Sequence, residues 1–197
     1  MRAVKKRRTY TLGRRAEQQA ETRQRIVEAA LDLHTRIGPA ATTISMIAEQ
    51  AGVQRHTLYA HFPDERSMLL ACSGLVAERD PLPDAQAWRP IADPRARLRH
   101  GLAAIYAWYA RNPELLSSIL RDAENHAPTR ETVMLRVGPQ MAAYREVLGA
   151  GLGATQRAML ELALGFFTWR TLVRDGGLAP AVAVEAMVRT VCDQPQD

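Results

Sequence analysis

A run of polar side chains between residues 54 and 61 has the chemistry needed to read hydrogen-bonding groups on another molecule. Its members are Gln54, Arg55, His56, Thr57, Tyr59 and His61. These side chains are hydrogen-bonding and largely flat or forked, and no carboxylate lies among them. Such groups bond both phosphate oxygens and the edges of bases. The run therefore indicates a surface that lies against DNA.

Two short helices joined by a tight turn would hold these side chains in place. The first helix carries apolar residues at helical spacing, namely Ile44, Ile47, Ala48 and Ala51. Thr43 can cap its start, and Gly52 ends it where a positive φ is useful. Val53 can fill the corner, and a second short helix turns Leu58 and Phe62 inward. The polar run then faces outward.

A longer helix is predicted on each side of this pair. The first runs from about residue 15 to residue 37, with Ile26, Ala30 and Leu33 on one face, and Gly38-Pro39 stops it. The other opens at Pro63-Asp64 and ends before a proline-rich loop that begins at residue 81.

The remaining chain also shows helical patterns. We expect helices at about 94–111, 113–125, 128–148, 155–174 and 180–192. Asp93-Pro94 and Asn112-Pro113 each pair a capping residue with a proline at the first helical position, and Gly138-Pro139 predicts a kink or break. No period-two alternation competes with these patterns. The sequence predicts an all-α chain of about nine helices.

Composition and cysteine usage limit the class of protein. The 197 residues are 47% hydrophobic and 24% charged, as in globular proteins, and no apolar run could span a bilayer. No apolar segment of the secretory type follows the basic N-terminus, and Cys72 and Cys192 share no metal-ligand spacing. We therefore expect a cytoplasmic protein that contacts no membrane and has no metal site or cofactor.

Positive charge is concentrated at the N-terminus. Seven Lys and Arg residues precede Glu17, whereas the net charge of the whole chain is +5, so the rest sums to about −2. Residues 1–14 lack apolar periodicity and are predicted to be a flexible basic arm. This arm either contacts DNA or is a solvated tail.

The helix pair closely resembles the DNA-binding domain of the TetR family of bacterial transcriptional regulators. That family's typical run is Thr, Ile-Ala, Ala-Gly-Val, Thr-Leu-Tyr and His-Phe. It is matched here by Thr43, Ile47-Ala48, Ala51-Gly52-Val53, Thr57-Leu58-Tyr59 and His61-Phe62. The resemblance covers roughly residues 23–70. It implies a three-helix, helix-turn-helix domain at 15–65 and a C-terminal helical domain at 66–197 for effector binding and dimerisation.

The resemblance also implies roles for single residues. Thr43, Tyr59 and His61 would contact phosphates, and Arg55, His56 and Thr57 would face base edges. Arg55 is the best candidate for sequence readout, because a guanidinium can bond guanine O6 and N7 together. One departure stands out: many members have a lysine for the DNA backbone three residues after the Phe, where this chain has Glu65. Other cations could supply this contact to the DNA backbone instead, namely Arg66 and the arm residues Lys5, Lys6, Arg7 and Arg8.

The second half of the sequence contains apolar helices that could form a dimer and aromatic residues that could form a ligand pocket. The last two helical patterns are apolar on more than one face, and the resemblance implies a homodimer that reads a palindromic double-stranded operator. Aromatic side chains are also frequent and could line a pocket for a small effector or belong to an ordinary core: Tyr106, Trp108, Tyr109, Tyr144, Phe166, Phe167 and Trp169.

The leading hypothesis is therefore a repressor released from its operator by a small hydrophobic or aromatic effector. An enzyme acting on a hydrophobic small molecule is one alternative, but no catalytic triad, paired carboxylates or phosphate-binding loop stands out, and we predict no catalytic residue. The other alternative is a DNA-binding protein without a ligand switch.

Overall fold

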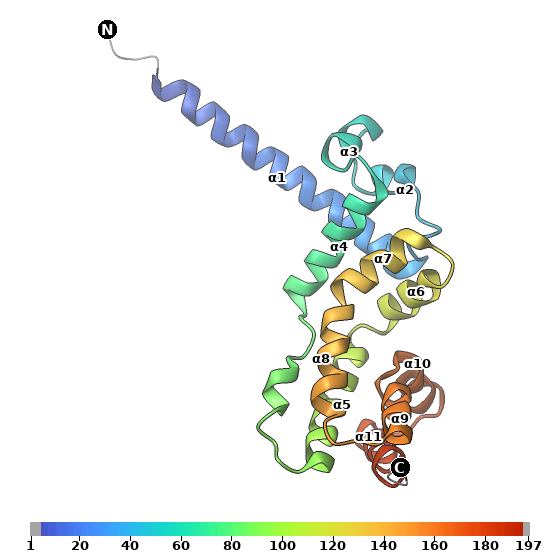
Figure 1. Ribbon diagram of the computed structural model, residues 1–197. Helices are drawn as coiled ribbons and strands as arrows, with labels where there is room; N and C mark the ends of the chain where they lie inside the picture. Colours follow the sequence, from blue (N-terminus) through green and yellow to red (C-terminus); the bar gives the residue numbers. More distant parts are fainter. Residues whose placement is uncertain (1–4, 195–197) are drawn as a thin grey trace.

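The computed structural model describes residues 5–194, with side chains from residue 13 onward, and the regular structure in that range is entirely helical (Figure 1). It contains eleven α-helices, a short 3-10 turn (η1) and one π-helical segment (η2). In chain order they are α1 (Lys5–Arg36), α2 (Ile44–Gln50), α3 (Arg55–His61), α4 (Glu65–Arg79), η1 (Ala85–Trp88), α5 (Pro94–Arg111), α6 (Pro113–Ala123), α7 (Ala127–Arg136), α8 (Gly138–Leu148), α9 (Ala154–Leu164), α10 (Phe166–Trp169), η2 (Arg170–Asp175) and α11 (Pro180–Cys192). The predicted all-α class is confirmed.

An N-terminal core joins α1, α2, α3 and the first half of α4. Ile26 and Ala30 of α1 are fully buried there, together with Leu58 of α3. Met68 and Cys72 of α4 complete the same cluster. Burial of apolar surface from four helices is what fixes α2 and α3 against the end of α1.

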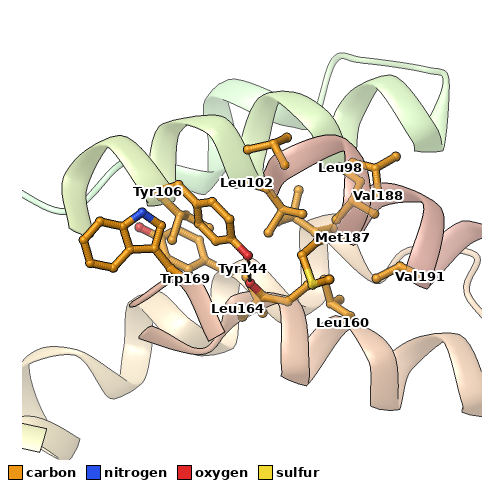
Figure 2. Packing of buried hydrophobic residues seen from close by; sticks show 14 of the residues in the cluster. Leu98, Leu102, Tyr106, Tyr144, Leu160, Leu164, Trp169, Met187, Val188 and Val191 are labelled. Carbon is orange, nitrogen blue, oxygen red and sulfur yellow. Dashed lines mark hydrogen bonds between the residues drawn. The ribbon is translucent and has the colours of Figure 1, made fainter. Parts of the chain in front are cut away.

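A second, larger core is built from η1, α5, α8, α9, α10 and α11. In this core, Leu98 of α5 lies beside Val188 of α11, whereas Tyr106 of α5 lies beside Trp169 of α10 (Figure 2). The two cores lie at opposite ends of the molecule, with α4, α6 and α7 between them (Figure 1).

A polar junction ties the loop before α2 to α6. The Asp122 carboxylate accepts a hydrogen bond from the Ala40 backbone amide at 2.9 Å, and Ser118 donates to the carbonyl of Thr35 at 2.9 Å. Arg121 donates to the carbonyl of Ile37. Gly38 has a φ of +93°, and a Cβ at this position would overlap Asp122. Any other residue at position 38 would strain the backbone and would also collide with the Asp122 side chain, so glycine is required here.

Two helical boundaries differ from the sequence-based expectation, and one expected break is present. α1 begins at Lys5 instead of residue 15, because residues 5–15 are rich in strong helix formers. The arm at residues 1–14 was expected to be flexible, and this expectation is wrong from Lys5 on. The 128–148 pattern separates into α7 and α8 at Gly138-Pro139, as the expected break allows. The expected helix at 155–174 is wrong as a single element, since Gly165 adopts an extended ψ of 129° and divides α9 from α10. These divisions raise the number of α-helices above nine.

Two predicted helix starts have different chemistry in the structure. Asp93 caps α5 by accepting hydrogen bonds from the amides of Arg95 and Ala96. Asn112 does not cap α6, because its side chain donates instead to Asp80 and to the carbonyl of Trp108. None of the helices in the described range is long and apolar enough to cross a lipid bilayer.

Candidate nucleic-acid interface

The turn between α2 and α3 is set by local backbone chemistry. Thr43 caps α2, as predicted, by accepting a hydrogen bond from the Met46 amide at 3.3 Å. At the other end, Gly52 has a φ of +64°. Its amide donates to the carbonyl of Glu49, and the Val53 amide donates to the carbonyl of Ala48. This paired arrangement is the Schellman motif, which ends a helix and turns the chain sharply.

The α3 helix presents its polar face to solvent. Leu58 and Phe62 are 0% and 1% exposed, so they anchor the helix to the N-terminal core. Arg55, His56 and Tyr59 are exposed, with 52% of Tyr59 accessible. The side chains of these three residues form no hydrogen bond or ion pair with the described part of the chain. They are free to meet an external partner.

Thr57 and His61 lie on the same short helix but are only half-buried. The His61 ring lies 6.5 Å from that of Phe62, which keeps it beside the core at the end of α3. Thr43 is exposed at the start of α2. Its hydroxyl oxygen accepts the capping bond, so the hydroxyl hydrogen can still be donated to a phosphate. The structure therefore brings the six predicted DNA-contacting residues together on α2 and α3.

Polar contacts fix α2 against α1. Gln50 donates to Asp32 of α1 at 2.7 Å and accepts from Arg36 at 2.9 Å. The hydrogen bond from Gln50, together with Arg36, holds the pKa of Asp32 below its ordinary value. The carboxylate therefore stays ionised and keeps both partners in place at neutral pH.

A cation that the sequence did not single out lies beside α3. The guanidinium of Arg23, on α1, stacks over the Phe62 ring with 4.8 Å between the guanidinium carbon and the ring centroid. Arg23 is exposed, and such stacking holds a flexible side chain in one orientation. Its position depends on how α1 packs against α3, and residue spacing does not reveal that packing.

In the structure, Glu65 contacts His126, which lies before α7 and not on α3. Glu65 is the first residue of α4, where Asp64 forms a capping box with Ser67. The Glu65 carboxylate lies 3.3 Å from Nε2 of His126, the residue that precedes α7. Arg66 is exposed on the next position. The side chains of Lys5, Lys6, Arg7 and Arg8 lie outside the described part of the structure, so their role stays a prediction.

The aromatic residues of the second half are brought together as part of the larger core. Six of the seven are buried, and only Phe167 is substantially exposed, at 40%. Tyr109 is at the centre, with Tyr106, Trp108, Phe166 and Trp169 within 6.2 Å between ring centroids. Tyr106 and Tyr109 donate to the carbonyls of Ala163 and Leu164. Burial raises the pKa of both phenols, so both remain protonated.

Two cavities of about 330 Å³ each lie elsewhere. One is a shallow hollow between α1 and α2, and the other lies where α1, α2, α4 and α7 meet. Neither is lined by any of the seven aromatic residues. Across residues 5–194, no three His, Cys, Asp or Glu side chains gather closely enough to hold a metal ion.

Residues 26–72, which contain this helix pair and its core, match the family model described as bacterial regulatory proteins of the tetR family. The chain contains a DNA-binding domain of the TetR family. It is accordingly a DNA-binding transcriptional regulator, and because the family is not enzymatic, the enzyme alternative is excluded.

Curated relatives are similar over different lengths. The HTH-type transcriptional repressor NicS of Pseudomonas putida is 23% identical over 146 residues, which cover 73% of this chain and 69% of NicS. The HTH-type transcriptional repressor KstR of Mycolicibacterium smegmatis is 30% identical over 106 residues. That match covers 54% of this chain and about half (52%) of KstR.

Solved structures of transcriptional regulators, among them the TetR-family protein PfmR, share the fold over most of the chain. PfmR from Thermus thermophilus has a TM-score of 0.58 at 21% identity and covers 87% of this chain and 99% of its own. FadR from Bacillus subtilis, solved in complex with stearoyl-CoA, has a TM-score of 0.61 at 17% identity, with 87% and 99% covered. At such low identity these two structures support the fold alone.

Proposed function

We propose that this protein is a dimeric repressor that binds a palindromic operator through α3 and is released by a small apolar effector. The observation that carries the proposal is the outward face of α3, where Arg55, His56 and Tyr59 are exposed and unpartnered. A helix whose inner face is anchored to the core and whose outer face is polar can enter the major groove. NicS and KstR are both named as repressors, which supports the direction of regulation.

Selectivity requires a second copy of the chain. One α3 helix of seven residues reads only a few base pairs, so a two-fold dimer is needed for a long operator. Large apolar side chains remain exposed on α9, on α10 and around α11: Leu162, Phe167, Leu178 and Val182 are 36–50% accessible. Because α9 and α11 pack together, these side chains support a dimer interface at the end of the molecule opposite α3.

The aromatic cluster around Tyr109 is the proposed effector site. Trp169 Nε1 is buried in this cluster without a hydrogen-bond partner among the described residues, so it can donate to a polar group on an effector. Opening of the packing around α10 would admit an apolar molecule, since Gly165 and η2 interrupt the regular helix there. The stearoyl-CoA bound to FadR supports a long apolar ligand as one class to test.

The base-reading role is tested by Arg55→Ala on the purified full chain. The operator is first located by genome-wide footprinting, and affinity is then measured for it and for a scrambled duplex at fixed salt. We expect a loss of about 1–3 kcal/mol on the operator, the worth of one bidentate base contact, and a much smaller loss on the scrambled duplex. Equal losses on both duplexes would refute base reading by Arg55.

Arg89→Ala is a matched control. It also removes one positive charge, but Arg89 lies at the end of η1, outside the N-terminal core, in a surface ion pair with Glu146. We expect both duplexes to bind this variant as they bind the wild type. The alternative of DNA binding without a switch predicts that no apolar ligand lowers operator affinity.

A further inference from the structure

The cavity at the junction of the two halves of the chain has an unusual lining. It holds about 330 Å³ and is bounded by the end of α1, the start of α2, α4 and His126. Its polar side chains are His34, Thr42, Thr43, Glu65 and His126. Given about 30 Å³ for each water in the liquid, this space accepts a molecule of roughly ten heavy atoms. The cavity is separate from the aromatic cluster.

His34 is the buried polar group of this cavity. Its side chain is only 5% exposed, and its ring makes no hydrogen bond with the described residues. Burial lowers the pKa of His34 to about 4, despite the opposing influence of the nearby Asp122 carboxylate. The ring is therefore neutral at physiological pH and has one donor and one acceptor nitrogen to offer. Because neither ring nitrogen is fully enclosed by protein, each can meet a water or a ligand atom in the cavity.

Glu65 gives the cavity its charge. One carboxylate oxygen lies 3.3 Å from Nε2 of His126, and Nδ1 of His126 lies 2.8 Å from the hydroxyl of Thr129. The other Glu65 oxygen has no partner within the described chain. Asp122 is paired with Arg121, so Glu65 is the carboxylate that sets the charge of the lining. With His34 neutral, this charge favours a cation over an anion. The apolar wall formed by Ile47, Met68 and Leu69 favours a compact hydrocarbon body.

We propose that this junction cavity binds a small organic amine with an apolar ring or branched chain. Its ammonium group donates to the Glu65 carboxylate and to the acceptor nitrogen of His34, and its hydrocarbon body lies against Ile47, Met68 and Leu69. A neutral imidazole and a carboxylate are both acceptors, whereas an ammonium group is purely a donor. Glu65 thereby acts in ligand binding.

The site is placed to influence DNA binding, and this part of the inference rests on the proposed function. Thr43 caps α2 and lines the cavity, Glu65 begins α4, and His126 precedes α7. An amine bound to Glu65 competes with His126 for the same carboxylate. It therefore alters the contact between α4 and the start of α7. A ligand that prefers one of the two arrangements shifts the population toward it.

Binding is tested with benzylamine as the probe, and with benzyl alcohol and benzoate as the neutral and anionic counterparts. Dissociation constants and affected residues are obtained from amide chemical shifts of the full-length protein at neutral pH. We expect benzylamine to bind most tightly, with shifts grouped around His34, Thr42, Leu69 and His126. Equal affinity for benzyl alcohol or benzoate, or shifts confined to the aromatic cluster, would overturn the site.

Variants identify the groups responsible. Glu65→Gln keeps the size of the side chain but removes its charge and replaces one acceptor oxygen with an NH2 donor. We expect it to weaken benzylamine at least about tenfold, the worth of one charge-assisted hydrogen bond. Glu78→Gln is the matched control, because Glu78 is an exposed carboxylate on the same helix outside the cavity, and it should change nothing. His34→Phe should weaken all three probes by filling the space. Unchanged benzylamine affinity in Glu65→Gln would refute the assignment even if His34→Phe fails to fold.

Operator binding is then measured with and without saturating benzylamine. We expect the dissociation constant to change by about fivefold or more, the lower end of typical coupling between two sites. If the protein binds its operator but benzylamine neither binds nor changes that affinity, this inference fails and the proposed function stands. If benzylamine occupies the cavity but no sequence-selective duplex is bound, the proposed function fails and the amine site stands.

Discussion

Replacing Asp122 with alanine tests how firmly the loop before α2 is held to the C-terminal helices. The Asp122 side chain is only 8% exposed, and it accepts hydrogen bonds from the Ala40 amide at 2.9 Å and from Arg121 at 2.8 Å. The variant leaves both donors without this acceptor. Because Ala40 is exposed, water can replace part of what is lost at its amide. We therefore expect a loss of about 1–2 kcal/mol in the free energy of unfolding, which lowers Tm by about 2–8 °C for a chain of this size.

Urea unfolding followed by two probes measures this change. The three tryptophans, Trp88, Trp108 and Trp169, all belong to the larger core, so tryptophan fluorescence reports on that core, whereas far-UV circular dichroism reports on all helices. In the variant, we expect the dichroism transition to move to lower urea than the fluorescence transition, because the N-terminal helices lose part of their attachment.

Two companion variants make the result specific to Asp122. Asp122→Asn keeps one acceptor oxygen for Ala40 and should lose about half as much stability. Asp193→Ala removes an exposed carboxylate that pairs with Arg95 at 2.7 Å, and a surface pair of this kind contributes less than about 1 kcal/mol. If Asp122→Ala costs no more than Asp193→Ala, the junction does not hold the two halves together as argued.

The remaining predictions concern the turns, the pH response and the dimer. Gly38→Ala and Gly52→Ala both place an L side chain at a positive φ, but only at Gly38 would the new Cβ overlap a neighbouring side chain. In urea titrations, Gly38→Ala should therefore lower the free energy of unfolding by at least about 1 kcal/mol more than Gly52→Ala does. The pKa of His34 lies near 4 in the folded chain and near 6.5 in the unfolded chain, so the unfolded chain binds the extra proton between these values. The free energy of unfolding should therefore fall by up to about 3 kcal/mol as pH drops from about 6.5 to 4. His34→Gln should lack this pH dependence, and a pH profile identical to that of the wild type would contradict the burial of His34. Val182→Glu places a charge on the exposed apolar side of α11, where 50% of Val182 is accessible. This variant should sediment as a monomer and bind the operator more than tenfold more weakly at about nanomolar protein. Unchanged sedimentation would place the dimer interface elsewhere.

Local sequence patterns were sufficient to predict the helix pair. Thr43 caps α2, Gly52 adopts the positive φ, and Leu58 and Phe62 point inward, all as expected from spacing. These features depend on hydrogen bonds and backbone conformations within a few residues of each other, so they are encoded where they occur. For the same reason, the polar outward face of α3 could be predicted before its partner was known.

Longer patterns were less dependable at their ends. Residues 155–174 carry apolar side chains along most of their length, which favours one helix, but Gly165 takes an extended conformation and the helix divides. Periodicity reports which residues prefer burial. It does not report where the packing of α10 against its neighbours makes a break more stable than a continuous helix.

The sequence by itself therefore determined the all-α class, the helix-turn-helix and the polar outward face of α3, because each follows from local spacing. Only the tertiary structure decided the contacts between distant segments. Residue spacing could not place Arg23 over Phe62, nor Asp122 beneath Ala40, 82 positions away. Glu65 illustrates the difference most clearly. In the sequence it is an unexpected carboxylate next to the DNA-reading helix, and in the fold it meets His126, because the packing of α4 against α7 brings together two residues that lie far apart in the chain.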